Sequence, residues 1–182
     1  MKTGDIIIYQ EPKKISRWWF IGKAISEATH SPWVHVGIIL KDPKWLGLKG
    51  TYIWESAWTG IPDSVDRITK FGVQVVPFDQ RIVPGITYHR EYTGPEFNQH
   101  KMKEIYDELL NKPYDINPVD WVEALTGYDP DPQREKRFWC SALVACILTK
   151  IGLLDEDTDW TITVPKYFAD PDLKFYGPIK QI

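Results

Sequence analysis

The most constraining feature of the sequence is a helix-forming segment that begins on a cysteine. Apolar residues recur at helical spacing through Val144, Ile147 and Ile151, and Gly152 follows as a helix stop. Cys140 lies at the start of this pattern, where unpaired backbone N–H groups and the helix dipole favour a thiolate over a thiol. Such a position suits a nucleophile, although an unpaired cysteine is often just a small buried apolar residue.

A second pattern predicts a strand that carries a histidine. Apolar residues alternate along 34–40, which puts His35 on the face opposite the valines, and Gly37 beside it leaves room for another group. Another strand is predicted over 51–55. If the two strands pair antiparallel, Glu55 can lie near His35 and hydrogen-bond its ring. Cysteine, histidine and an orienting polar residue are the three parts of a thiol-hydrolase site.

Each of these residues also has a purely structural interpretation when it is taken alone. His35 could be a core histidine with satisfied hydrogen bonds, and Glu55 could be an exposed charge at a strand end. What favours a site is the combination with Cys140 and the order in which the surrounding blocks follow one another. These blocks cover residues 3–8, 31–38, 54–57, 113–115 and 140–144.

In that order the chain resembles the circularly permuted papain-like cysteine enzymes of the NlpC-type superfamily. The group it resembles most is the YiiX-like branch, which is related to the lecithin:retinol acyltransferase-like proteins. In ordinary papain-like enzymes the cysteine precedes the histidine, whereas here, as in the permuted branch, the histidine strand comes first. The resemblance implies an α+β fold, with a small antiparallel sheet packed against a helix that bears the nucleophile at its N-terminus. It also implies Cys140 as nucleophile, His35 as general base and Glu55 as the third polar residue.

The groups around the nucleophile are less well defined. The Cys140 backbone N–H is one expected donor to an oxyanion, because it lies at the helix start. Tyr9 or Tyr114 could supply a second donor, and the sequence does not choose between them. Phe138 and Trp139 stand where related enzymes often carry smaller or polar residues. Trp139 is therefore a further candidate for contact with an apolar or aromatic substrate group.

The composition indicates one compact domain over residues 1–182. Hydrophobic residues make up 43% of the chain and charged residues 26%, which is enough for a core and a soluble surface. A net charge of -3 argues against a general nucleic-acid binder, which would carry a basic face. The first residues form no apolar signal segment, and no run approaches transmembrane length. We therefore expect a cytoplasmic or otherwise intracellular protein, in which a catalytic thiol stays reduced.

The sequence lacks the residue patterns that are typical of disulfides, metal sites and phosphate-binding loops. Cys140 and Cys146 are offset around one helix and too far apart along it for an easy disulfide. His30, His35 and Cys140 could each bind a metal, but no CxxC, HxH or HExxH spacing gathers them. No glycine-rich phosphate loop of the GxxxxGK type occurs either. We expect neither a metal nor a cofactor.

The remaining elements are predicted from periodicity and turn residues. A helix is expected from Pro95 to the Lys112–Pro113 step, and an aromatic, basic helix over 15–28. The helix over 15–28 either packs on the sheet or lies on an anionic membrane surface, and we expect weak or no membrane association. Further strands are expected over 5–9, 72–78 and 86–92, a loop over 127–132 and an acidic turn over 155–157.

Taken together, the sequence predicts a cysteine hydrolase that forms an acyl-enzyme on Cys140. Hydrolysis of an amide or peptide bond is the first expectation. Lipid acyl transfer or thioester hydrolysis at the same site is the alternative for an enzyme, and a non-catalytic binding module is the alternative of another class. The expected substrates are peptides, amides or lipid esters, and the sequence assigns no oligomeric state.

Overall fold

The computed structural model describes residues 1–12, 23, 25–27, 29–115 and 136–182. The predicted helix over 15–28 falls largely outside these residues, and the predicted loop over 127–132 falls entirely outside them. Within the described part of the chain, no helix has both the length and the apolar character needed to cross a membrane.

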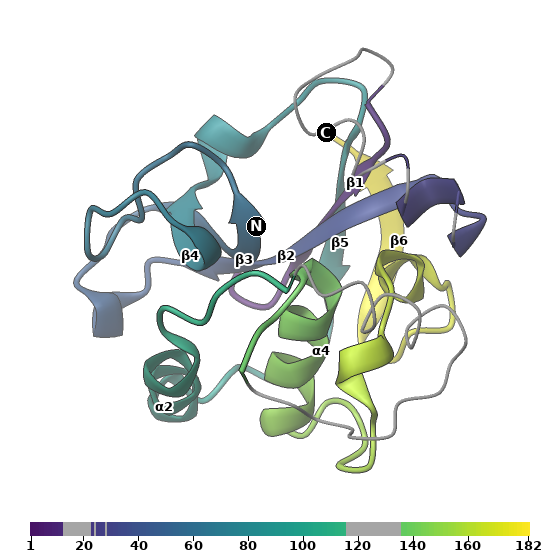
Figure 1. Cartoon of the computed structure of the whole chain (residues 1–182). Coiled ribbons are helices and arrows are strands. Elements are labelled where there is room, and N and C mark those ends of the chain that lie inside the picture. Colours follow the sequence, from purple (N-terminus) through teal and green to yellow (C-terminus); the bar gives the residue numbers. More distant parts are fainter. Residues whose placement is uncertain (13–22, 24, 28, 116–135) are drawn as a thin grey trace.

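A six-stranded antiparallel sheet forms the frame of the molecule, with strand order β4-β3-β2-β1-β5-β6 (Figure 1). Its strands alternate apolar side chains between two faces, as antiparallel sheets do. The α+β class with an antiparallel sheet, predicted from the sequence, is confirmed. The strands are β1 (Ile6–Gln10), β2 (Trp33–Lys41), β3 (Thr51–Trp58), β4 (Phe71–Pro77), β5 (Thr87–Tyr92) and β6 (Tyr176–Gln181).

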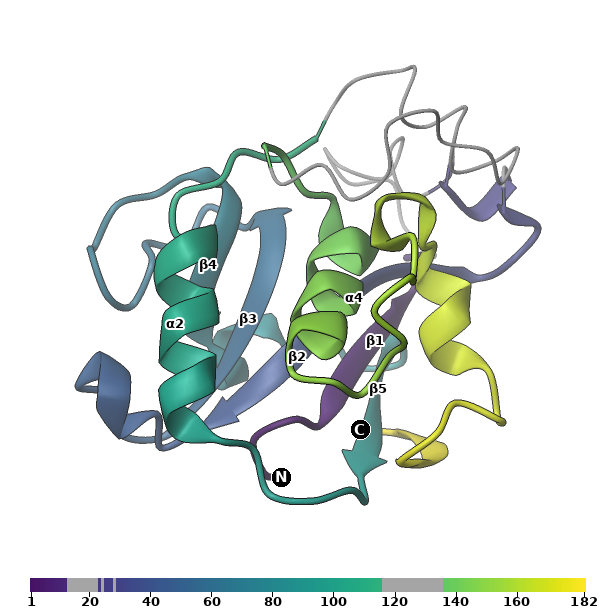
Figure 2. The ribbon, with the colours of Figure 1, turned by 90° about the horizontal axis from the view of Figure 1, so that it is seen from below.

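In the described part of the chain, helices α2 (Gln99–Leu109) and α4 (Cys140–Lys150) cover one face of this sheet, as Figure 2 shows from below. Helix α2 buries one stripe of apolar side chains. Helix α4 is buried at every position from Cys140 to Leu148, because α2 and the C-terminal segments flank it on the sheet. A helix that is apolar on all sides is stable only in such an interior position.

A smaller apolar cluster lies on the opposite face of the sheet. It contains Ile7, Tyr9, Ile39, Ile53 and Val76, with Ile61 and Phe78 packed against it. Phe78 belongs to η2 (Phe78–Arg81), a short 3-10 helix that follows β4. The period-2 pattern therefore separates the two faces as predicted, with His35 and Glu55 in phase with this smaller cluster.

Most strand boundaries agree with the sequence-based prediction to within one residue, and the larger differences concern α2, β3 and β6. Helix α2 begins at Gln99 rather than at Pro95, because the Asn98 side chain accepts hydrogen bonds from the first backbone N–H groups of the helix. Strand β3 continues past Glu55 to Trp58. Strand β6 was not predicted, since a Gly-Pro pair interrupts its pattern, but its position at the sheet edge tolerates a proline.

Candidate active site

His35 lies near one end of β2, directly opposite Tyr9 of β1 in the antiparallel ladder. The two ring centroids are 5.3 Å apart, so Tyr9 forms one wall beside the imidazole. The His35 side chain is 18% exposed. The sheet therefore holds the imidazole in place, while part of the ring stays accessible to solvent.

Glu55 reaches His35 across the sheet from β3, and this predicted contact is confirmed. Its Oε2 accepts a short hydrogen bond from Nε2 of His35. Gly37 makes the approach possible, because a Cβ at that position would lie 2.5 Å from Cγ2 of Ile53 and 3.3 Å from Cβ of Glu55. The Glu55 carboxylate is fully buried. A buried carboxylate needs further polar partners to stay ionised.

Arg81 supplies those partners, and sequence reasoning missed it. Its Nε donates to Oε1 of Glu55 at 2.7 Å and its Nη2 donates to Oε2 at 2.9 Å. Burial opposes the charged carboxylate, but the charge of Arg81 and the hydrogen bond from His35 lower the pKa of Glu55 to about 2. Burial likewise opposes the charged guanidinium, and the charge of Glu55 raises the pKa of Arg81. The guanidinium lies 5.4 Å from the centre of the Tyr9 ring.

Cys140 is the first residue of α4, with Trp139 as its N-cap, so the predicted helix start is confirmed. Helix α4 packs on the face of the sheet opposite to the one that carries His35. Cys140 and His35 come close to each other near the end of the ladder between β2 and β3. The last pair of this ladder is Ile38–Trp54. Beyond that pair, β2 continues against β1 while β3 continues against β4. The ladder therefore ends beside His35, and there Cys140, at the start of α4, lies within hydrogen-bond reach of the imidazole.

The chain that enters α4 is fixed from two sides. Oγ of Ser56, the neighbour of Glu55 on β3, donates to the Phe138 carbonyl at 2.6 Å. The Phe138 N–H donates to the Pro113 carbonyl at 3.1 Å, and Tyr114 pairs with Phe138 in a parallel bridge. Gly72 allows this segment to approach β4, because a Cβ there would lie 2.3 Å from the Lys112 carbonyl oxygen. The sequence blocks 54–57 and 113–115 thus position Phe138, two residues before Cys140.

The environment of His35 favours its protonated form beside Cys140. Burial disfavours the charged ring, but the charge of Cys140 and hydrogen bonds to Cys140 and Glu55 raise the pKa of His35 to about 9. Nε2 is bound to Glu55, which leaves Nδ1 as the ring nitrogen for the thiol. An ionised Glu55 fixes the tautomer and orientation of the ring. The arrangement therefore provides a thiol and an orienting carboxylate that both contact the same imidazole.

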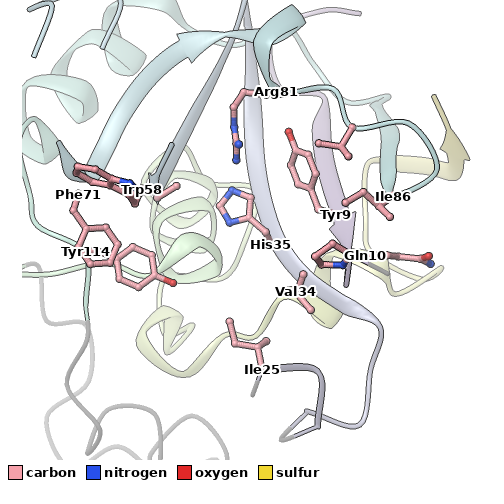
Figure 3. Close-up of a pocket in the computed structure, with 13 residues that line it drawn as sticks. Tyr9, Gln10, Ile25, Val34, His35, Trp58, Phe71, Arg81, Ile86 and Tyr114 are labelled. Atoms are coloured by element: carbon pink, nitrogen blue, oxygen red, sulfur yellow. The ribbon is translucent and has the colours of Figure 1, made fainter. Parts of the chain in front are cut away.

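A cavity of about 250 Å³ opens beside His35 (Figure 3). Tyr9 and Tyr114 both line it, from opposite sides of His35, and the Tyr114 hydroxyl is directed toward the His35 side. Burial and the charges of Cys140 and Asp115 raise the pKa of Tyr114 well above its usual value, so its hydroxyl stays a donor. The Tyr9 hydroxyl is buried and has no hydrogen-bond partner among the described residues.

Trp139, the third candidate for substrate contact, does not line this cavity. Its side chain is 9% exposed, and its Nε1 donates to the Thr163 carbonyl at 3.2 Å. Phe138 stacks on Trp160 in the core, with ring centroids 5.3 Å apart. Both aromatic residues therefore pack inward and hold the start of α4 in place. The described residues also contain no group of three or more His, Cys, Asp or Glu side chains placed to bind a metal ion.

The architecture is that of an α+β protein with a six-stranded antiparallel sheet and a buried central helix. Among solved structures it is similar to the crystal structure of the metalloprotein YiiX from Escherichia coli O157:H7, with a TM-score of 0.53. The match covers 99% of this chain and 88% of that chain at 19% sequence identity. At this identity the likeness establishes a shared fold and nothing about activity. No protein-family model and no curated protein sequence matches the chain.

Proposed function

We propose that this protein is a cysteine hydrolase with a circularly permuted papain-like fold. The observation that supports the proposal is that His35 contacts both Cys140 and Glu55. Cys140 provides a thiol at a helix start, and Glu55 provides a buried carboxylate bound to Nε2 of His35. Although burial disfavours the charged ring, together they raise the pKa of the imidazole to about 9. A nucleophile, a base and a group that orients the base constitute the arrangement used in thiol acyl transfer. The histidine strand precedes the cysteine helix, which is the permuted order.

The reaction begins from a Cys140 thiolate and a His35 imidazolium. The thiolate attacks the carbonyl carbon of the substrate. We assign stabilisation of the oxyanion to the backbone N–H of Cys140, at the start of α4, and to the Tyr114 hydroxyl, which is directed toward the His35 side. His35 then gives its proton to the departing amine, which leaves an acyl group on Cys140. Water attacks this thioester while His35 accepts its proton, so that the acid is released and the thiolate–imidazolium pair is restored.

An amide or peptide is the first substrate class for this chemistry, because His35 can protonate a poor amine leaving group. Capture of the same acyl-enzyme by a lipid or alcohol instead of water would give an acyltransferase. Both reactions begin with the same step on Cys140. Acylation of Cys140 is therefore the step to test first.

The first experiment compares the two cysteines. Both thiols are buried, but Cys140 starts α4 beside His35, whereas Cys146 lies inside the same helix. We expect iodoacetamide to alkylate Cys140 at least ~10-fold faster than Cys146 at neutral pH, since a helix start and a nearby imidazolium both favour the thiolate. Peptide mass spectrometry of the folded protein reads both rates.

Two variants serve as controls in that experiment. His35→Ala should slow alkylation of Cys140 without changing that of Cys146, because the ring acts on one thiol alone. Cys140→Ala should fold normally and lose all rapid labelling. Equal alkylation rates at both cysteines in the folded wild-type protein would refute Cys140 as the nucleophile. That result would favour a non-catalytic binding module over a cysteine hydrolase.

A further inference from the structure

The cavity beside His35 has an aromatic wall. Phe71 and Tyr114 stack with ring centroids 4.6 Å apart and an angle of 10° between their planes. Trp58 packs edge-on against Phe71 at 6.4 Å, at the end of β3. Figure 3 shows the three side chains together on one side of His35. The lining also includes the apolar side chains of Val34, Val83 and Ile86.

Two large apolar side chains at this cavity are exposed to solvent. Trp58 is 41% exposed and Val83 is 44% exposed, although both line the cavity. They come from different segments, one from the end of β3 and one from the loop that precedes β5. Exposed apolar residues that gather around a concave site indicate a binding surface for an apolar ligand.

The charges at the cavity are already compensated within the protein. Among the described residues that line it, His35 and Arg81 are the side chains that carry charge near neutral pH. Arg81 is held in a two-point ion pair by Glu55, and His35 lies between Glu55 and Cys140. A charged group on a ligand would have to give up its hydration without gaining an uncompensated partner of opposite charge.

We infer that the cavity binds an uncharged, apolar acyl group of the substrate next to the reacting carbonyl. This inference rests on the proposed function and adds the substrate class. The volume of about 250 Å³ lies just below the roughly 300–1,000 Å³ of sites for drug-sized ligands, so the group is small. Trp58 is the residue whose ring an apolar acyl group would cover, because it lines the cavity and is 41% exposed.

The first test measures binding separately from catalysis. It uses the Cys140→Ala protein and three amides of equal chain length: hexanamide, 6-aminohexanamide and the monoamide of adipic acid. These probes carry no charge, one positive charge and one negative charge near neutral pH. We expect hexanamide to bind at least ~10-fold more tightly than either charged amide, because the described residues that line the cavity offer no uncompensated counter-charge. Equal or tighter binding of a charged amide would overturn the inference.

Variants of Trp58 locate the binding. In the Cys140→Ala background, Trp58→Ala should weaken hexanamide binding about fivefold through lost apolar contact, while Trp58→Phe should keep most of it. Tyr167→Ala is a matched control, since Tyr167 is 38% exposed and lines a different cavity. No effect of Trp58→Ala, or an equal effect of Tyr167→Ala, would also overturn the inference.

A second measurement keeps this inference distinct from the proposed function. Wild-type protein is incubated with p-nitrophenyl hexanoate and with the mono-p-nitrophenyl ester of adipic acid, and mass spectrometry follows the acyl group on Cys140. The inference expects faster acylation by the uncharged ester. Equal acylation by both esters would refute the apolar site and keep the hydrolase. No acylation by either ester, with tight binding of hexanamide intact, would refute the hydrolase and keep the apolar site.

Discussion

Arg81 donates to both carboxylate oxygens of Glu55, with Nε at 2.7 Å from Oε1 and Nη2 at 2.9 Å from Oε2. The same carboxylate accepts from Nε2 of His35, so Glu55 joins an arginine on η2 to a histidine on β2. Bidentate arginine–carboxylate pairs fix geometry as well as charge. Arg81 does not touch the thiol in this arrangement. It is a positioning residue that acts on His35 through Glu55.

The first prediction concerns this coupling. Arg81→Met should lower the free energy of unfolding by about 3 kcal/mol, the usual cost of removing one partner from a buried ion pair. The loss should be much smaller in a Glu55→Gln background, where no charge is left unpaired. Urea denaturation of the two single variants and the double variant measures the coupling directly. The exposed pair Lys103–Asp107 provides the control, because Lys103→Met should cost less than ~1 kcal/mol. Additive losses for Arg81 and Glu55 would contradict the coupling.

The relation between His35 and Glu55 could be predicted from the sequence because it depends on local periodicity. Alternation along 34–40 and 51–55 fixes which side chains share a face, and antiparallel pairing then brings Glu55 beside Gly37 and His35. The start of α4 at Cys140 was equally accessible, since it follows from helical spacing and a following glycine.

Arg81 could not be predicted in this way. It ends a 3-10 helix that has no periodic pattern, and its contact with Glu55 spans 26 residues of sequence. The available signal was indirect: a carboxylate buried in a sheet requires a cation. The end of the β2–β3 ladder at Ile38 was inaccessible for a related reason, because it depends on tertiary packing and not on local periodicity. Trp139 was expected at the substrate, but it packs inward against the Thr163 carbonyl.

The second prediction is the pH dependence of amide hydrolysis. In the proposed mechanism the imidazolium of His35 protonates the amine leaving group. Although burial disfavours the charged ring, the charge of Cys140 together with hydrogen bonds to Cys140 and Glu55 raises the pKa of His35 to about 9. We therefore expect kcat/KM for a hexanoyl amide of 7-amino-4-methylcoumarin to fall as the pH rises through about 9. Glu55 favours the imidazolium, so Glu55→Gln should lower the pKa of His35 and move the fall to lower pH. If kcat/KM of the Glu55→Gln variant fell at the same pH as that of the wild-type protein, a group other than His35 would be responsible for the fall.

The third prediction separates the two tyrosines at the cavity. Tyr114→Phe should lower kcat about 100-fold, as expected for the loss of one oxyanion donor, while the ring stack on Phe71 is kept. Tyr9→Phe should leave kcat nearly unchanged and should raise the free energy of unfolding by about 1 kcal/mol, because the buried Tyr9 hydroxyl has no partner among the described residues. Steady-state kinetics and urea denaturation of both variants test this. The reverse pattern of kcat would assign the donor to Tyr9.

The fourth prediction concerns metal removal, which matters because the structurally similar YiiX is named a metalloprotein. In this chain Nε2 of His35 is bound to Glu55, and the described residues form no cluster of three metal-binding side chains. Dialysis against EDTA should therefore leave acylation of Cys140 within about twofold of its starting rate, since the proposed nucleophile is a thiolate and not a metal-bound water. Loss of acylation with EDTA and its recovery on adding zinc would contradict the thiol mechanism.

The last prediction tests whether the close approach at Gly37 sets the site. Gly37→Ala places a Cβ 2.5 Å from Cγ2 of Ile53 and 3.3 Å from Cβ of Glu55, so Glu55 must move away from β2. We expect a loss of about 1–3 kcal/mol in unfolding free energy, typical of overpacking. Acylation of Cys140 should also slow, and the fall of its rate with rising pH should occur at lower pH, as in Glu55→Gln. Gly177→Ala is the matched control on β6, where an added Cβ meets its nearest neighbour, the Glu91 carbonyl oxygen, at 3.6 Å. A Gly37→Ala protein that loses stability but keeps both the rate and the pH profile would show that the separation of Glu55 from His35 does not depend on this contact.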